Sequence, residues 1–322
     1  MPRSERLKGI DYVGAILVAG ATVSGVMAIS FGGALYPWNS GQTIGCFVAS
    51  GVLWIALGIQ QGLPLFATTE TRLFPFEMIK DWELDIFFAQ TAASIACAFI
   101  PIYFIPLYFQ FVRNDTALQA GVRLLPFVFL MVFSTIMNGA FMAKLQIYMP
   151  WYFLGGILVV VGAALMYTID VDSTAAQVYG YGIILGIGAG AYSQASFSVA
   201  QAKVARERVA EVTAFIGFGQ MMGITLALSI AASVFINRAT LGIADLVPDA
   251  PIGAVQAAIQ GVGSSFFESL DDGQRRQILD VVVSSMGDAY ILCMAGGALS
   301  VVLSLFMKRE RLFMEEAVAG GA

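Results

Sequence analysis

Residues 120–143 read AGVRLLPFVFLMVFSTIMNGAFMA, a run in which Arg123 is the only charged side chain. A bilayer core about 30 Å thick is crossed by a helix of roughly 20 mostly apolar residues, so this run is long enough. No water reaches the hydrocarbon core, and the backbone polar groups must therefore be satisfied within the segment itself, as they are in a helix. The stretch predicts a transmembrane helix.

Seven other apolar runs are also of membrane-spanning length. They lie at residues 11–34, 41–62, 86–111, 151–169, 177–202, 211–236 and 288–307. Of the 322 residues in the chain, 58% are hydrophobic and only 12% are charged, whereas a soluble domain carries about 25% charged residues. The sequence therefore predicts an all-α, multi-pass integral membrane protein with eight transmembrane helices, arranged as a pair followed by a set of six.

Two segments that are more polar than the spans divide the chain. Residues 63–85 are expected to form a cytoplasmic connector, and residues 237–287 a long extracytoplasmic loop. Within that loop, Val255–Phe267 and Gln274–Met286 are amphipathic enough for short helices at the membrane face, with a loosely ordered loop as the alternative. Residues 1–62 are the N-terminus with the first two helices, and residues 86–236 are the first five helices of the set of six. Residues 288–322 are the last helix with a cytoplasmic tail.

The basic residues predict an orientation. With the N-terminus in the cytoplasm, twelve of the 17 Lys and Arg residues fall in inner segments and five in outer ones. Cytoplasmic segments of membrane proteins carry an excess of Lys and Arg, so both termini are expected to be cytoplasmic.

Several classes of chemistry lack their usual residues. The chain contains no His, and Cys46, Cys97 and Cys293 are dispersed over three apolar spans. This pattern fits neither a disulfide framework nor a metal site. No basic run indicates a nucleic-acid partner. We expect no enzymatic activity, no cofactor and no metal.

Weakly polar side chains recur at helical spacing inside the spans. In span 86–111 one face carries Gln90 and Tyr108, and a Gln that faces lipid is costly, so this face should meet either protein or a water-filled path. Ordinary interhelical hydrogen bonds are the alternative. We expect five such residues to line a solute path: Gln90, Tyr108, Asn138, Gln194 and Gln220. Arg123 is expected at the outer mouth, paired with a lipid phosphate or a carboxylate, or acting as an interfacial anchor.

Glycines recur in two spans. Small residues allow helices to approach closely in lipid, so we expect helix contacts at Gly182, Gly186, Gly190, Gly217 and Gly223. The run 186–190 imitates a dinucleotide-binding pattern, but no strand precedes it and it lies inside an apolar span.

Charged residues are missing from the middle of all eight spans. Intramembrane carboxylates are the usual proton relays of pumps and antiporters. A proton-coupling residue is therefore not expected in this chain, and the polar groups that it offers suit small amphipathic solutes.

Four blocks of sequence carry a family resemblance. They are Ser30-Phe31-Gly32-Gly33 with Trp38-Asn39-Ser40-Gly41, Gly121-Val122-Arg123-Leu124-Leu125-Pro126, the 186–190 run with Gln194 and Gln201, and Phe215, Phe218, Gln220 and Gly223 with Val234-Phe235-Ile236-Asn237. From about Asp11 to Arg311 the chain resembles the fungal fourteen-helix drug:proton antiporter branch of the major facilitator superfamily. The blocks are similar to the first linker helix and to the second, fourth and fifth helices of the C-terminal bundle. In one departure, Gln146 stands where the family usually has Gly between a Lys and a Tyr.

The resemblance implies two linker helices followed by a C-terminal six-helix bundle. Intact members of the family export drugs, toxins and secondary metabolites in exchange for protons, and we expect the plasma membrane rather than the vacuole. Nothing in the chain matches the motifs of the N-terminal bundle, and such transporters bind solute between two bundles. We therefore expect a truncated half that is inactive alone and needs a second helical bundle. The alternative is a non-transporting membrane subunit or regulator that pairs with another bundle.

Overall fold

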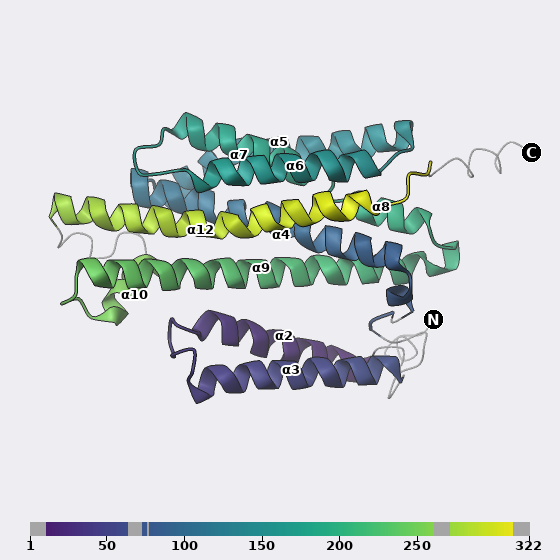
Figure 1. Ribbon diagram of the computed structural model, residues 1–322, viewed down its shortest axis with the longest axis horizontal. Coiled ribbons are helices and arrows are strands. Elements are labelled where there is room, and N and C mark those ends of the chain that lie inside the picture. Colours follow the sequence, from purple (N-terminus) through teal and green to yellow (C-terminus); the bar gives the residue numbers. More distant parts are fainter. Residues whose placement is uncertain (1–10, 64–72, 76, 261–270, 312–322) are drawn as a thin grey trace, which may run out of the picture.

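The computed structural model describes residues 11–63, 73–75, 77–260 and 271–311 (Figure 1). Within these ranges the chain is helical, and an isolated bridge between Gly32 and Tyr36 is the only β-type pairing. Eight segments of the described residues are long and apolar enough to cross a membrane. The predicted fold class and the number of spans are confirmed.

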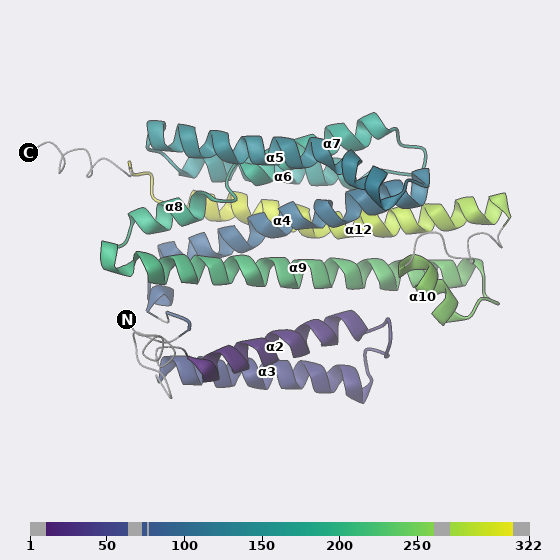
Figure 2. The same ribbon diagram turned by 180° about the vertical axis from the view of Figure 1, so that it is seen from behind.

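The first two helices form an antiparallel hairpin beside the rest of the molecule (Figures 1 and 2). They are α2 (Tyr12–Phe31) and α3 (Gly41–Gly62). Each begins at a side chain that satisfies a free N–H group of the first turn: Asp11 accepts from the Gly14 N–H, and Ser40 accepts from the Thr43 N–H. The hairpin packs along one helix of the bundle, α9.

The remaining spans form a six-helix bundle. Its helices are α4 (Trp82–Arg113), α5 (Ala117–Leu145), α6 (Met149–Tyr167), α7 (Ala175–Gly190) with α8 (Ala195–Ala202), α9 (Val209–Leu246) and α12 (Asp272–Leu305). The innermost elements are α4 and the α7–α8 pair, in which 61% and 67% of the most apolar stretch is buried, against 11% for α5. The flank formed by α5 is therefore largely exposed.

Glycine allows the closest helix contacts. A Cβ added to Gly156 of α6 would lie 2.9 Å from the Gly297 carbonyl oxygen of α12, and one added to Gly162 would lie 2.5 Å from the backbone nitrogen of Leu185 in α7. At these positions backbone meets backbone without room for a methyl group, as small residues permit in membranes.

The predicted outer loop at 237–287 is shorter and more helical than expected. Helix α9 continues to Leu246, α10 covers Ile252–Gln260, and α12 already begins at Asp272. The stretch expected as a separate helix, Gln274–Met286, is the first part of the last membrane helix, because its apolar face is buried in the bundle through Ile278 and Val282. The end of the other expected helix, Val255–Phe267, lies outside the described residues from residue 261 onward.

The connector also ends earlier than predicted. Helix α4 starts at Trp82 instead of residue 86, because Asp81 caps it by accepting a hydrogen bond from the Glu83 N–H at 3.0 Å. A single 3-10 turn, Met78–Lys80, precedes the cap, and Met78 is buried. Residues 64–72 and 76 of the expected connector lie outside the described part of the chain.

Candidate functional site

A break in a membrane helix lies against α5. Helix α7 ends at Gly190 and α8 begins at Ala195, so residues 191–194 form a turn inside one span. Two hydroxyl groups of α5 satisfy carbonyls at the break: Ser134 donates to the Ile187 oxygen at 2.9 Å, and Thr135 donates to the Gly190 oxygen at 3.1 Å. Irregular backbone at membrane depth is tolerated where it is buried in protein or lines a cavity, and broken helices form the binding sites of many transporters.

The five glycines singled out in the sequence have different surroundings. A Cβ on Gly186 would lie 2.9 Å from the Phe127 carbonyl oxygen, and one on Gly190 would collide with the Met131 carbonyl oxygen. Both contacts hold α7 against α5, which brings the break to the α5 hydroxyls. A Cβ added to Gly223 would lie 2.5 Å from the Ala92 carbonyl oxygen of α4, so this contact also excludes a side chain. A Cβ added to Gly182 would meet its neighbours at ordinary distances of 3.4 Å or more. Gly217 instead borders open space, with nothing within 4 Å of an added Cβ.

Polar side chains gather around the break. Asn138 follows Ser134 by one turn of α5, is 3% exposed, and has a side-chain nitrogen with no hydrogen-bond partner among the described residues. Ser193, in the turn, is buried with its hydroxyl 3.4 Å from that of Thr135, and Gln194 next to it is exposed. A buried amide donor without a partner is rare and calls for an acceptor that the described residues do not supply. The fifth expected path residue, Gln220, is half-buried on α9.

Gln90 and Tyr108 are engaged in fastening helices. The Gln90 amide is fully buried and donates to the Ser300 carbonyl oxygen of α12 at 2.9 Å. The Tyr108 hydroxyl donates to the Asp170 carbonyl oxygen, also at 2.9 Å, in the turn between α6 and α7. Both side chains thus donate to backbone carbonyls of other parts of the bundle, and a role in lining a path stays a prediction. The alternative of interhelical hydrogen bonds describes them.

Arg123 is held by the chain itself. Its guanidinium forms an ion pair with Asp115, donates to the Tyr179 hydroxyl at 3.1 Å and lies 4.8 Å above the centre of the Phe109 ring. The Arg123 side chain is 34% exposed. A carboxylate, one of the partners expected for Arg123, forms this ion pair, and the arginine joins α5 to α4 and α7.

A cluster of charges closes the opposite end of the bundle. Glu83, 8% exposed, lies 2.5 Å from the ammonium groups of both Lys203 and Lys308, and Lys203 also pairs with Glu310. Burial lowers the pKa of Lys203, but its hydrogen bonds to Glu310 and Glu83 outweigh this effect, and the pKa of the ammonium is raised above its ordinary value. The Lys203 ammonium also lies 5.6 Å from the centre of the Tyr148 ring.

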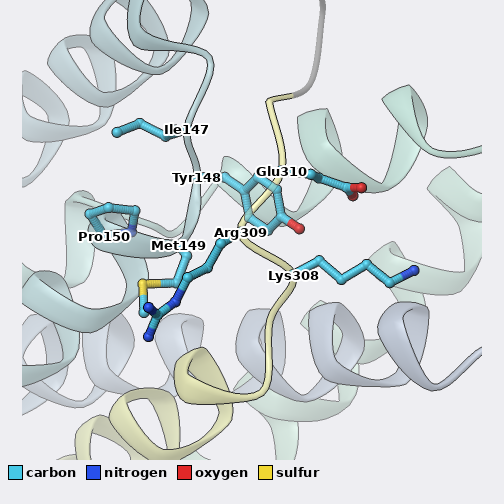
Figure 3. A pocket seen from close by; sticks show the side chains of 7 residues that line it. All are labelled: Ile147, Tyr148, Met149, Pro150, Lys308, Arg309 and Glu310. Carbon is cyan, nitrogen blue, oxygen red and sulfur yellow. The ribbon is translucent and has the colours of Figure 1, made fainter.

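The segment after α12 crosses this end of the bundle (Figure 3). Lys308 and Arg309 extend to opposite sides of it, with the Tyr148 ring between them, and Arg309 reaches toward Met149. A cavity of about 340 Å³ separates this segment from the α5–α6 turn. Sequence reasoning missed the cluster because its members lie more than 100 residues apart in pairs such as Glu83 and Lys203. The only sequence signal is that each charge stands at the end of a span.

Metal and disulfide chemistry find no support in the described residues. No group of three or more Cys, Asp or Glu side chains there could hold a metal ion, and the three cysteines are free. What the geometry offers is a set of neutral donors and acceptors at an interrupted membrane helix.

Comparison with known proteins identifies the family. The sequence profile of the Major Facilitator Superfamily matches residues 1–228. The chain belongs to the major facilitator superfamily. Its family and its relatives are transporters rather than enzymes.

Similar curated proteins are fungal members of this superfamily. The chain is 51% identical to the MFS-type transporter pgmG of Aspergillus terreus over 310 residues, which are 96% of this chain and 55% of that protein. It is 41% identical to the phomenoic acid biosynthesis cluster MFS-type transporter of Leptosphaeria maculans, over 98% of this chain and 53% of that protein. It is also 41% identical to the efflux pump alnA of Emericella nidulans, over 98% of this chain and 58% of that protein. The chain thus spans about half the length of these relatives.

A solved structure supports the fold. A bacterial homologue of the human lysosomal transporter Spinster, in an inward-facing and unoccupied conformation, aligns with a TM-score of 0.53 at 16% identity. The alignment covers 88% of this chain and 68% of the other.

Proposed function

We propose that this chain forms one wall of the solute path in an exporter of small amphipathic molecules such as drugs, toxins or secondary metabolites. The observation that carries the proposal is the α7–α8 break, where the buried Asn138 amide has a donor without a partner. Relatives named as efflux pumps support the direction of transport. The resemblance to the fourteen-helix branch assigns α2 and α3 as linker helices and the other six spans as a C-terminal bundle.

Each polar group at the break receives a role. Asn138 donates a hydrogen bond to a carbonyl or hydroxyl oxygen of the solute, because its amide nitrogen is buried and unpaired in the described structure. Gln194 is exposed at the turn and reaches the same solute from α7–α8. Gln220 contributes a further amide from α9. Arg123 positions the outer ends of α4, α5 and α7 and does not contact solute.

The opposite wall is assigned to a second helical bundle. Helix α5 buries only 11% of its most apolar stretch, and Val122, Leu125, Phe129 and Val132 expose between 47% and 68% of their surface. Transporters of this kind bind solute between two bundles that rock against one another. The partner bundle would also supply the protonatable group for exchange with protons. By the excess of basic residues, both termini face the cytoplasm, and the plasma membrane is the proposed location.

Export by cells tests the proposal. Cells that express this chain alone should retain a fluorescent amphipathic compound as control cells do, and cells that also express the N-terminal half of a full-length relative should lose it in an energy-dependent way. In the second strain, Asn138→Leu should abolish most of the efflux, whereas Asn39→Leu, in the exposed turn before α3, should leave it intact. Energy-dependent efflux from the chain alone would contradict the half-path proposal. Unchanged efflux by the Asn138→Leu protein would exclude the break as the site.

A further inference from the structure

A groove separates the α2–α3 hairpin from the bundle. It has a volume of about 510 Å³ and is lined by α2 on one side and α9 on the other, with Leu73 at one end. The α9 wall includes Gly217, whose missing side chain leaves open space, and Met221, which is 60% exposed. Although the hairpin packs against α9 elsewhere, the two helices leave a gap at this stretch.

The hairpin is fastened to the bundle beyond one end of the groove and at one residue of its α9 wall. At the turn between α2 and α3, Asn237 donates to the Gly32 carbonyl oxygen at 3.1 Å, and Gln256 donates to the Ala34 carbonyl oxygen at 2.6 Å. Within the α9 wall, the Phe218 ring lies against Trp54 and Phe74, with centroid distances of 6.3 and 5.2 Å. Closing the groove would require these contacts to shift.

The dimensions of the groove match one leaflet of a bilayer. Its α9 wall runs from Ala214 to Thr225, and the eleven steps of about 1.5 Å between these two residues rise about 16 Å in an α-helix. This is half of a hydrocarbon core about 30 Å thick. Both walls belong to membrane spans, so the medium that reaches the groove consists of lipid tails. It begins at the end of the molecule where α2 and α9 start, which is the expected cytoplasmic side.

The chemistry of the lining suits a hydrocarbon chain. Its polar side chains are Thr22 and Thr225, and the Thr225 hydroxyl donates to the Met221 carbonyl oxygen of its own helix at 2.8 Å. Sites for drug-like molecules carry a few convergent polar groups, and a polar solute here would lose hydrogen bonds without replacement. Methionine side chains adapt to a flexible apolar ligand.

We propose that one acyl chain of a phospholipid, from the leaflet beside the start of α2, occupies this groove and joins the hairpin to the bundle. The proposal goes beyond export and does not depend on it. The lipid replaces the side-chain contacts that Gly217 cannot make, so the hairpin and α9 are packed through the lipid along the length of the groove.

Photolabelling of the purified full chain tests the proposal. The protein in nanodiscs is irradiated with a phosphatidylcholine that carries a diazirine near the end of one acyl chain, and labelled residues are mapped by mass spectrometry. Labelling is expected on residues 18–23 and 217–225. A Cβ added at Gly217 has nothing within 4 Å, so Gly217→Leu should extend into the groove. It should lower this labelling about tenfold, as expected when two methylene contacts of an acyl chain are lost.

Matched substitutions control for effects on folding and helix propensity. Gly51→Leu on α3 makes the same chemical change at a glycine that also has nothing within 4 Å, and it should leave the labelling unchanged. Val23→Phe fills the groove from the α2 side, with Val48→Phe on α3 as its control; Val23 and Val48 are 56% and 59% exposed. Equal labelling in filled and control proteins would overturn the proposal. Loss of labelling on addition of a soluble amphipathic drug would reassign the groove to solute.

Discussion

Replacing Lys203 by Met should destabilise the bundle more than replacing any other cation of the cluster. Lys203 and Glu83 expose only 11% and 10% of their side chains, at a nitrogen–oxygen distance of 2.5 Å. At an effective dielectric constant of about 20, unit charges at this distance attract by roughly 6–7 kcal/mol before desolvation is subtracted. Breaking a buried pair costs about 3–5 kcal/mol, because the remaining charge is left without its partner.

Lys308 reduces this cost. It lies 2.5 Å from the other oxygen of Glu83 and is 57% exposed, so the carboxylate keeps one cation after Lys203→Met. We therefore expect the free energy of unfolding to fall by about 2–3 kcal/mol for Lys203→Met, toward the lower end of the range for buried pairs. Lys308→Met should cost less than about 1 kcal/mol, as exposed pairs do.

The measurement is reversible unfolding in mixed micelles, followed by circular dichroism as denaturing detergent is added. The double variant Glu83→Gln with Lys203→Met should be more stable than the sum of the two single effects predicts, because both buried charges of the pair are then removed together. The reasoning fails if Lys203→Met costs no more than Lys308→Met, or if the double variant is additive.

Three further outcomes are expected in the same assay. Gly190→Ala should lower the free energy of unfolding by about 1–3 kcal/mol, because the new methyl group meets the Met131 carbonyl. Gly217→Ala should raise the free energy of unfolding by up to about 1 kcal/mol, because alanine favours the helix and has room there. Equal effects of the two substitutions would contradict the assigned contacts. Gln146→Gly should stabilise by about 0.5–1 kcal/mol, because Gln146 caps α5 with a left-handed φ of 59°; a loss of stability would refute this. Burial raises the pKa of Asp11, but hydrogen bonds, the strongest from the Gly14 N–H, outweigh it and lower the pKa overall. The stability that this carboxylate contributes should therefore persist above the ordinary Asp pKa of about 4 and be lost as the pH falls below it, and Asp11→Asn should abolish that part of the acid dependence.

The existence of the eight helices could be predicted because the bilayer fixes their length. Their ends could not, since an amphipathic segment can continue a membrane helix beyond the lipid when the bundle itself buries one face. Ile278 and Val282 of α12 have no exposed surface for this reason, although they lie outside the apolar run 288–307 from which this span was predicted. A hydropathy scale measures how favourably a segment transfers into lipid. It gives no information on a segment that is buried by protein outside the bilayer.

The candidate site could be predicted only in part. Gln90 and Asn138 carry the same amide group, lie in apolar spans and are both buried, yet one meets a carbonyl oxygen and the other meets none. The Gln90 partner, Ser300, is 210 residues away. The periodicity of one helix predicts which way a side chain points. It does not predict which backbone group of a distant helix lies opposite that side chain. The α7–α8 break was missed for a related reason, since its carbonyls are satisfied by hydroxyls of α5.

The position of the charges suggests how such a wall would move. Ion pairs close both ends of the bundle: Lys203 with Glu83 at one end, and Arg123 with Asp115 at the other. Between them the described helices are joined by neutral hydrogen bonds and glycine contacts, because unpaired charge is expensive in hydrocarbon. Helices fastened at both ends should rotate together, as the rocking of a whole bundle requires. Weakening an end cluster such as Lys203 with Glu83 should therefore lower the stability of the bundle. It should change solute recognition at Asn138 only if the helices of the bundle also separate.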